Sequence, residues 1–194
     1  RMVFRQFLDS SDPVVQAGAV AQSTNASVVA SFDGVNDVDF VVPPDTNGDV
    51  GPNNYVQWVN LSLAVYDRAG ALLYGPAAGN TLWSGFGAPC ETLNNGDPIA
   101  QYDHLADRWV MSQFALPNYN PPSSSAGPFY ECVAVSTTGD PTGSWYRYEF
   151  KISDTKLDDY PHLGVWSDAY YMSINQFNIP AGSWGGAGAV AFER

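Results

Sequence analysis

The sequence predicts an all-β fold made of four-stranded antiparallel sheets that resemble the blades of a β-propeller. Three observations predict it: short runs of β-branched and aromatic residues alternate with Gly, Pro, Asn and Asp turns, no stretch of about a dozen residues keeps the helical apolar period, and one group of runs recurs along the chain. The 194 residues are enough for one domain with a sizeable core. The same pattern allows a β-sandwich of the lectin or jelly-roll type as the alternative.

The order of elements follows from composition. Residues 1–31 are rich in small and polar side chains and are expected to form an extended N-terminal arm or linker, so residues 32–194 are expected to carry the blades. Residues 118–128 contain two adjacent prolines and three serines, and they are expected to be an irregular loop. The expected strands are residues 55–60, 63–67, 71–74, 98–102, 108–114, 131–136, 145–150, 162–166, 169–174 and 188–192.

An internal repeat groups these strands into about three blades. The segment from Asp97 to Ser112 matches the segment from Asp158 to Ser173 at one constant spacing, and a weaker copy begins at Asp45. The third unit ends after its third strand, and a closed ring needs about four to eight blades. We therefore expect the chain to be part of a larger propeller, whose remaining blades come from another chain or from a lost segment.

The charge balance excludes several classes of partner. The chain has 20 acidic and 8 basic residues, which gives a formal net charge of −12. Since so few basic residues cannot form a basic patch, nucleic acid is excluded as a partner. No apolar run approaches the roughly 20 residues of a transmembrane helix, so membrane insertion is not expected.

The two cysteines, Cys90 and Cys132, are predicted to form a disulfide. They are too few for a structural zinc site, and little lysine with abundant Asn, Ser and Gly is typical of secreted proteins. Two unrelated buried thiols are the alternative. The disulfide would contribute roughly 4 kcal/mol on the chain-entropy model, and it predicts a secreted or cell-surface location.

Four segments carry a resemblance to a known family: 44–57, 96–109, 132–136 and 160–166. They resemble secreted bacterial β-propeller proteins described as sialidase-like or BNR-repeat proteins, a group without one agreed activity. The resemblance implies a secreted or cell-surface propeller. The hairpin 138–145 is similar to the Asp box of these proteins, in which an aspartate caps the turn between a blade's third and fourth strands.

Sialidase activity itself is not expected. Its chemistry needs three arginines that converge on the substrate carboxylate, together with a Tyr/Glu nucleophile pair. Arg68, Arg108 and Arg147 each lie in or beside a different strand run, with no sign of convergence.

The first candidate site is the loop with Asp45, Asn47 and Asp49. Oxygen-bearing side chains at alternate positions of a glycine-containing loop can bind calcium, which takes six to eight oxygen ligands. These three residues are therefore the predicted metal ligands, with Ca²⁺ as the candidate cofactor. The alternative is a loop in which the same side chains only bind backbone amides.

The second candidate site joins acids and aromatic rings. Asp97, Asp158 and Asp159 are expected near the propeller axis, where carboxylates can line a channel mouth, hold a metal or act as an acid/base pair. Alternatively, these aspartates close turns by accepting hydrogen bonds from backbone N–H groups. Trp166 and Trp184 lie in loop-like segments and are candidate platforms for a glycan.

Together these features predict an extracellular module that binds a glycan or a protein partner, with no catalysis identified and with calcium as a candidate stabiliser. The alternative is a glycan-active hydrolase or lyase of sialidase-like propeller architecture, which would use carboxylates at the channel mouth.

Overall fold

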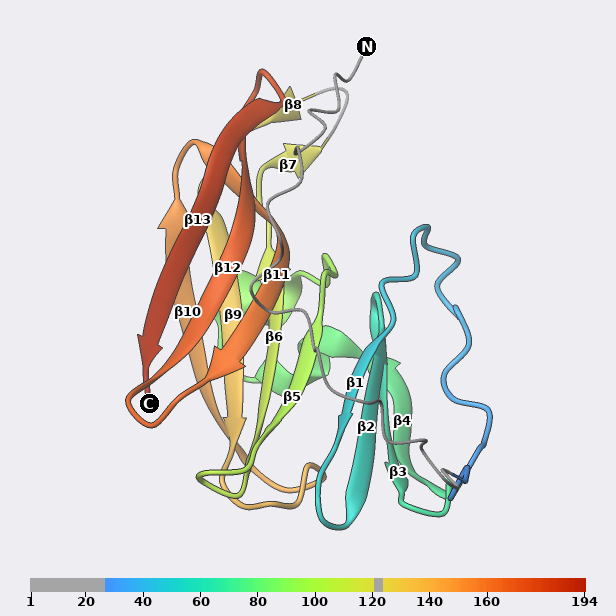
Figure 1. Cartoon of the computed structure of the whole chain (residues 1–194). Coiled ribbons are helices and arrows are strands. Elements are labelled where there is room, and N and C mark those ends of the chain that lie inside the picture. The colour runs from blue at the N-terminus through green and yellow to red at the C-terminus, as the bar shows by residue number, and fades with distance from the viewer. Residues whose placement is uncertain (1–26, 121–123) are drawn as a thin grey trace, which may run out of the picture.

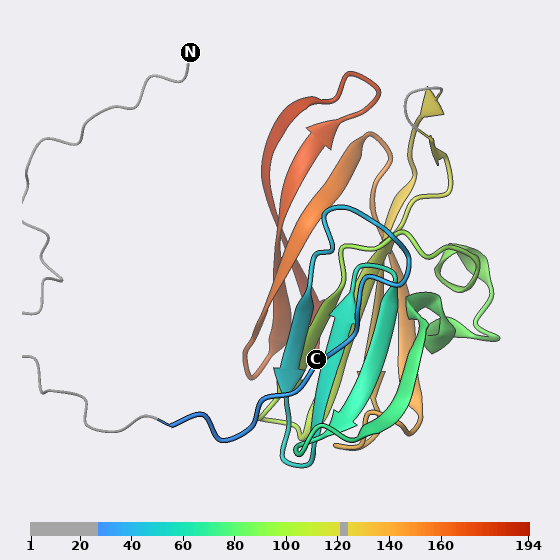
Figure 2. The same ribbon diagram turned by 90° about the vertical axis from the view of Figure 1, so that its right-hand side faces the viewer.

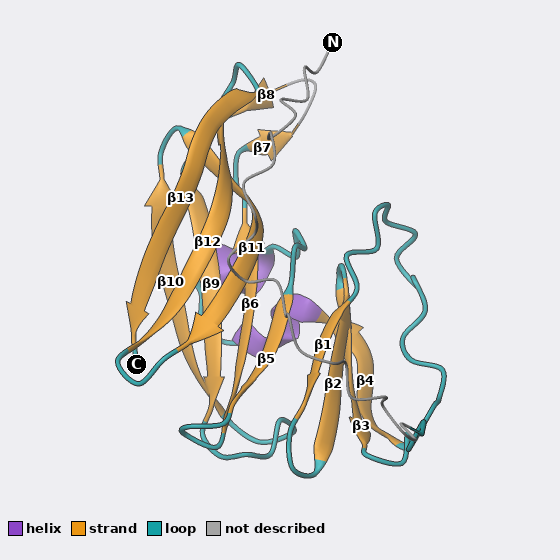
Figure 3. Ribbon diagram, viewed as in Figure 1, coloured by secondary structure: helices purple, strands orange, loops and turns teal. Residues whose placement is uncertain are grey.

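The computed structural model describes residues 27–120 and 124–194, and in this part the chain is all-β and antiparallel, as predicted (Figures 1 and 3). Two short helices, η1 (Gly79–Trp83) and α1 (Ala88–Thr92), follow the fourth strand. The strands are β1 (Asn47–Val50), β2 (Asn54–Val59), β3 (Ser62–Asp67), β4 (Leu72–Ala78), β5 (Ile99–Asp103), β6 (Arg108–Ala115), β7 (Tyr119–Asn120), β8 (Ser124–Ser125), β9 (Phe129–Ser136), β10 (Trp145–Ser153), β11 (Lys156–Val165), β12 (Ala169–Asn178) and β13 (Ser183–Glu193).

Three sheets form the body of the protein. The first sheet has the order β1-β2-β3-β4, the second sheet has the order β5-β6-β9-β10, and the third sheet has the order β11-β12-β13. A small ribbon of β7 and β8 projects beyond the second sheet (Figure 1). In the described residues the sheets form an open row and do not close into a ring.

Ten of these strands are the ten that the sequence predicts, but some expectations were wrong. β1 was missed because Asn-Gly-Asp-Val has the composition of a turn, and only its pairing with β2 makes it a strand. The segment 118–128 is not wholly irregular, since Tyr119 pairs with Ser125 in the β7–β8 ribbon.

The sheets lie face to face with their inner strands β1, β5 and β11 next to one another (Figures 1 and 2). The first and second sheets share a core that includes the completely buried rings of Trp58 and Trp109. The second and third sheets share two further clusters, one around Met172 and one around Phe129. The second sheet is buried on both faces, because alternate residues of β6 and β9 belong to the core shared with the first sheet and to the core shared with the third.

The register of the third sheet corrects the repeat. Ile99 pairs with Ser112, and His162 pairs with Ser173, so the counterpart of Asp97 is Tyr160 and not Asp158. The shift arises because the two hairpins differ in length. Residues 104–107 connect β5 to β6. In the β11–β12 hairpin the Trp166 N–H still donates to the Ala169 carbonyl, so only residues 167–168 form the turn.

The predicted disulfide between Cys90 and Cys132 is confirmed. It joins α1 to β9 and so holds the helical insertion against the second sheet. No helix in residues 27–120 and 124–194 has the length and apolar character needed to cross a membrane.

Most of the expected N-terminal arm, residues 1–26, lies outside the described residues. The described segment that follows runs along the outer face of the first sheet without forming a strand (Figure 2). There the ring of Phe32 packs against Tyr55 and Tyr66, with centroid distances of 5.8 and 5.4 Å, and Val35 N–H donates to Gln57 Oε1 at 2.7 Å.

Candidate functional site

The three inner strands meet at a cavity of about 290 Å³, which we call the mouth. Each sheet contributes three consecutive residues to its wall. The trios of the second and third sheets are equivalent in register, since Ile99 pairs with Ser112 and His162 pairs with Ser173. The lining residues are Asp45, Thr46 and Asn47 of the first sheet, Asp97, Pro98 and Ile99 of the second, and Tyr160, Pro161 and His162 of the third.

The leading residue of each trio has a left-handed backbone. The φ angles of Asp45, Asp97 and Tyr160 are 42°, 48° and 54°. Aspartate tolerates this region better than most residues, whereas tyrosine there is strained by roughly 1 kcal/mol or more. The Tyr160 N–H donates to Asp97 Oδ2 at 2.9 Å, so the second sheet holds the strained residue of the third in place.

The mouth is acidic, and its carboxyl groups influence one another. Burial, together with the charges of Asp159 and Asp45, raises the pKa of Asp97 to about 6, against the opposing effect of the Tyr160 N–H. The pKa of Asp159 is also raised, first by burial and then by the charge of Asp45. Beside these acids the residue Tyr160 is 56% exposed, and its ring lies edge-to-face with the ring of His162 at a centroid distance of 4.5 Å.

A buried acidic pair lies behind the mouth, between the second and third sheets. Asp158 and Glu131 are both 0% exposed. Burial, followed by the charges of Asp97 and Asp159, raises the pKa of Asp158 to about 7, and burial together with the charge of Asp158 raises the pKa of Glu131. Glu131 is not among the site residues predicted from the sequence, although a glutamate inside the apolar run of β9 is a signal that points to it.

The structure brings together some of the predicted ligand-binding residues and separates others. Asp97 lines the mouth, Asp159 adjoins it, and Asp158 lies behind it. Trp166 follows the end of β11 and Trp184 begins β13 beside Phe177, so the two rings lie at opposite ends of the third sheet. Both are exposed, but neither lines the mouth, and the aromatic ring that does so is Tyr160.

The three residues predicted to bind calcium make hydrogen bonds that hold strands and loops together. Asn47 Oδ1 accepts the Ala100 N–H at 2.7 Å, and Asp49 Oδ2 accepts the Tyr102 N–H at 2.8 Å, so both join β1 to β5. Asp45 Oδ2 accepts from Asn60 Nδ2 at 3.3 Å. No three His, Cys, Asp or Glu side chains of the described chain gather as a metal site, and calcium binding at this loop stays a prediction.

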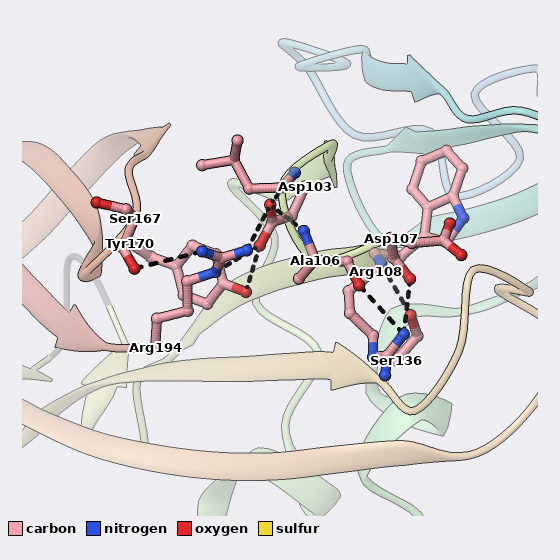
Figure 4. A network of polar contacts seen from close by, with 10 residues as sticks. Asp103, Ala106, Asp107, Arg108, Ser136, Ser167, Tyr170 and Arg194 are labelled. Atoms are coloured by element: carbon pink, nitrogen blue, oxygen red, sulfur yellow. Dashed lines mark hydrogen bonds and ion pairs between the residues drawn. The ribbon is translucent and has the colours of Figure 1, made fainter.

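A second polar centre fastens the third sheet to the second at the far end of β5 (Figure 4). The carboxylate of Asp103 is completely buried and accepts the N–H groups of Leu105 and Ala106 at 2.8 and 3.1 Å. It also accepts the Tyr170 hydroxyl at 2.9 Å and Arg194 Nε at 2.9 Å. Every oxygen of this carboxylate is engaged within the fold, which indicates a structural role.

The arginines considered for sialidase chemistry each bind a backbone carbonyl in a different part of the fold. Arg68 donates to Pro52, Arg108 to Asp107 and Arg147 to Ser84, at 3.4, 2.9 and 2.5 Å. These bonds give no sign of a shared carboxylate-binding centre.

No protein-family model, curated protein or solved structure matches this chain. Its function is therefore inferred from the mouth and the groups that surround it.

Proposed function

We propose that this chain is an extracellular binding module of the β-propeller type that recognises a glycan at the mouth, without catalysis. The observation that supports this proposal is the convergence of three sheets on one acidic cavity with an exposed aromatic ring. Carboxylates accept hydrogen bonds from sugar hydroxyls, and an exposed ring offers an apolar face to a sugar. The disulfide supports the extracellular location, because such bonds persist in oxidising compartments.

The charge of the site narrows the ligand class. Asp45, Asp97 and Asp159 gather at the mouth of a chain whose formal net charge is −12. Anionic sugars would be repelled by these groups, so the proposal specifies an uncharged or amino-bearing glycan.

Further blades belong to the same proposal. β13 leaves its outer edge unpaired among the described residues, whereas the first and second sheets each have a fourth strand. An unpaired edge favours addition of another strand, and additional blades would also cover the exposed face of the third sheet.

One observation favours the enzymatic alternative. Since its pKa is about 6, Asp97 would stay partly protonated in mildly acidic solution and could act as a general acid in glycoside hydrolysis. This alternative requires a second carboxyl group at about 5–10 Å across the bound sugar.

The test is a glycan array probed with the purified chain, followed by calorimetry with an uncharged glycan that binds. We expect Asp97→Asn and Tyr160→Ala each to weaken binding at least tenfold (~1.4 kcal/mol), because one removes a charged acceptor and the other the stacking ring. Trp166→Ala is the matched control, since it removes an exposed ring that lies outside the mouth. Preference for anionic glycans, or equal losses in the control, would contradict the proposal.

The pH dependence separates the two functions. A sugar hydroxyl binds the ionised carboxylate better, so affinity should rise as the pH passes upward through about 6 and then level off. If Asp97 acts as the general acid, the rate of hydrolysis should instead fall over the same pH range. Release of reducing sugar would establish this enzymatic function. Asp97→Asn should flatten the profile, and His162→Gln tests the contribution of the neighbouring imidazole. The other ionisable groups around Asp97 are Asp45, Asp158, Asp159 and Glu131.

A further inference from the structure

Two buried carboxyl groups have no hydrogen-bond partner among the residues that the structure describes. Glu131 on β9 and Asp158 on β11 are fully buried, and all of their carboxyl oxygens are unpaired in the described part of the chain. The hydroxyl of Ser112 on β6 is buried and unpaired as well. Native proteins leave few buried polar atoms unpaired, and a bound water or ion commonly explains those that are.

The three side chains belong to one cluster across the interface between the second and third sheets. Ser112 pairs with Val133, and Glu131 lies two residues before Val133 on β9, so Ser112 and Glu131 lie on the same face of the second sheet. The third sheet packs on this face through the clusters that contain Val133 and Leu157. Among charged groups, Asp158 has the strongest influence on Glu131, and Ser112 is close enough to affect it without completing a hydrogen bond.

Among residues 27–120 and 124–194, no basic side chain forms an ion pair with Glu131 or Asp158. The nearest lysine in sequence, Lys156, directs its ammonium group to Gln176 Oε1 at 3.3 Å and to the Gly185 carbonyl at 3.1 Å. The ion pairs in the described residues are Lys151–Asp154 and Arg194–Asp103, and neither of them includes Glu131 or Asp158. Buried charges are retained in proteins when they are paired or when they coordinate a metal.

We propose that Glu131, Asp158 and Ser112 form a site for a hard divalent cation of the calcium class, which joins the second sheet to the third behind the mouth. All donors are oxygens, a set that favours Ca²⁺ or Mg²⁺ over zinc, which prefers nitrogen and sulfur. Calcium fits better than magnesium, because it accepts carboxylates in either mono- or bidentate geometry and tolerates irregular coordination.

The site has two carboxylates instead of three, and water would complete the coordination. Asp97 lies between this site and the mouth, since its charge influences both Glu131 and Asp158 while its side chain also lines the mouth. The proposal therefore has the hydrated cation enter from the mouth, past Asp97. This inference is independent of glycan binding, because it concerns the groups behind the mouth.

The experiment uses the full chain, stripped with a chelator and titrated with CaCl₂ or MgCl₂ alone by calorimetry and thermal unfolding. We expect one Ca²⁺ per chain, a rise in Tm on adding Ca²⁺, and weaker binding of Mg²⁺. Glu131→Gln and Asp158→Asn should each lower the Ca²⁺ affinity at least tenfold, and Ser112→Ala by a few-fold.

Two variants are controls for other acidic groups. Glu193→Gln neutralises an exposed acid at the end of β13 in the third sheet, and Asp49→Asn changes the loop with the calcium ligands predicted from the sequence. Both should keep the Ca²⁺ affinity of the wild type. Loss of binding in Asp49→Asn, with Glu131→Gln and Asp158→Asn unaffected, would move the site to the loop and overturn the inference.

Two further results would overturn it. One is the absence of any Ca²⁺ uptake or Tm shift in the wild-type chain at millimolar Ca²⁺. The other is a stripped protein that is stabilised by Glu131→Gln or Asp158→Asn while calcium has no effect, which would mean that the pair is held neutral by protons. If Glu131→Gln or Asp158→Asn fails to fold, the wild-type titration and Ser112→Ala decide between the outcomes.

Discussion

Asp49 shows how one side chain connects two sheets. Its carboxylate accepts the Tyr102 N–H of β5 at 2.8 Å, across 53 positions of sequence. The neighbouring Asn47 Oδ1 likewise accepts a backbone N–H of β5, whereas Asp45 Oδ2 accepts from the side chain of Asn60. Local spacing reveals which donors and acceptors exist, whereas the choice of partner depends on how the sheets stack.

We predict that Asp49→Ala lowers the free energy of unfolding by about 1–2 kcal/mol. The substitution leaves the Tyr102 N–H without its acceptor, and an unsatisfied, partly buried amide destabilises the folded state. Urea denaturation measures the effect. Asp49→Asn keeps an acceptor oxygen and should lose less than half as much, and equal losses in the two variants would contradict this role.

The helical insertion is the element whose placement depends on a covalent bond. Cys90 of α1 is joined to Cys132 of β9, and the Cys90 N–H also donates to Glu149 Oε2 of β10 at 3.0 Å. Glu91 Oε1 and Oε2 accept the N–H groups of Gly85 and Gly87, and these bonds lower the pKa of the Glu91 carboxyl. The sequence predicted the bond between the cysteines but not the two helices, because each spans little more than one turn and leaves no periodic pattern.

We predict that the double variant Cys90→Ala/Cys132→Ala loses roughly 2–4 kcal/mol of unfolding free energy. The cross-link restricts the unfolded chain, and its removal frees the loop between α1 and β9. Calorimetry with and without a reducing agent checks this result. The reducing agent should lower the Tm of the wild type toward that of the variant and leave the variant unchanged, and a variant as stable as the oxidised wild type would refute the prediction.

At the scale of the whole molecule, three sheets are held together by their faces and by a few buried polar groups. The Asp103 carboxylate connects the end of β5 to Tyr170 of β12 and to Arg194 (Figure 4). The cost of burying this carboxylate is offset because both of its oxygens accept hydrogen bonds from groups within the fold.

We predict that Asp103→Ala destabilises the protein by about 3–5 kcal/mol. The substitution removes a buried charge that connects two sheets and leaves the groups that bind it without a partner. Arg194→Ala should cost less, since Asp103 keeps the two backbone amides and the Tyr170 hydroxyl. Thermal unfolding with hydrogen exchange of the third sheet would show the difference. Similar losses in the two variants would mean that Arg194 carries the connection.

The sequence alone determined ten of the thirteen strands in the described residues, the disulfide and the acidic character of the protein. Each of these depends on neighbouring residues, on the small number of cysteines or on composition, so no knowledge of the stacking was needed. The tertiary structure decided which residues share the mouth, since the shorter hairpin after β11 places Tyr160 opposite Asp97 and moves Asp158 into the interior. It also decided that Glu131 meets Asp158, because two strands that are distant in sequence approach each other only when the faces of their sheets pack together.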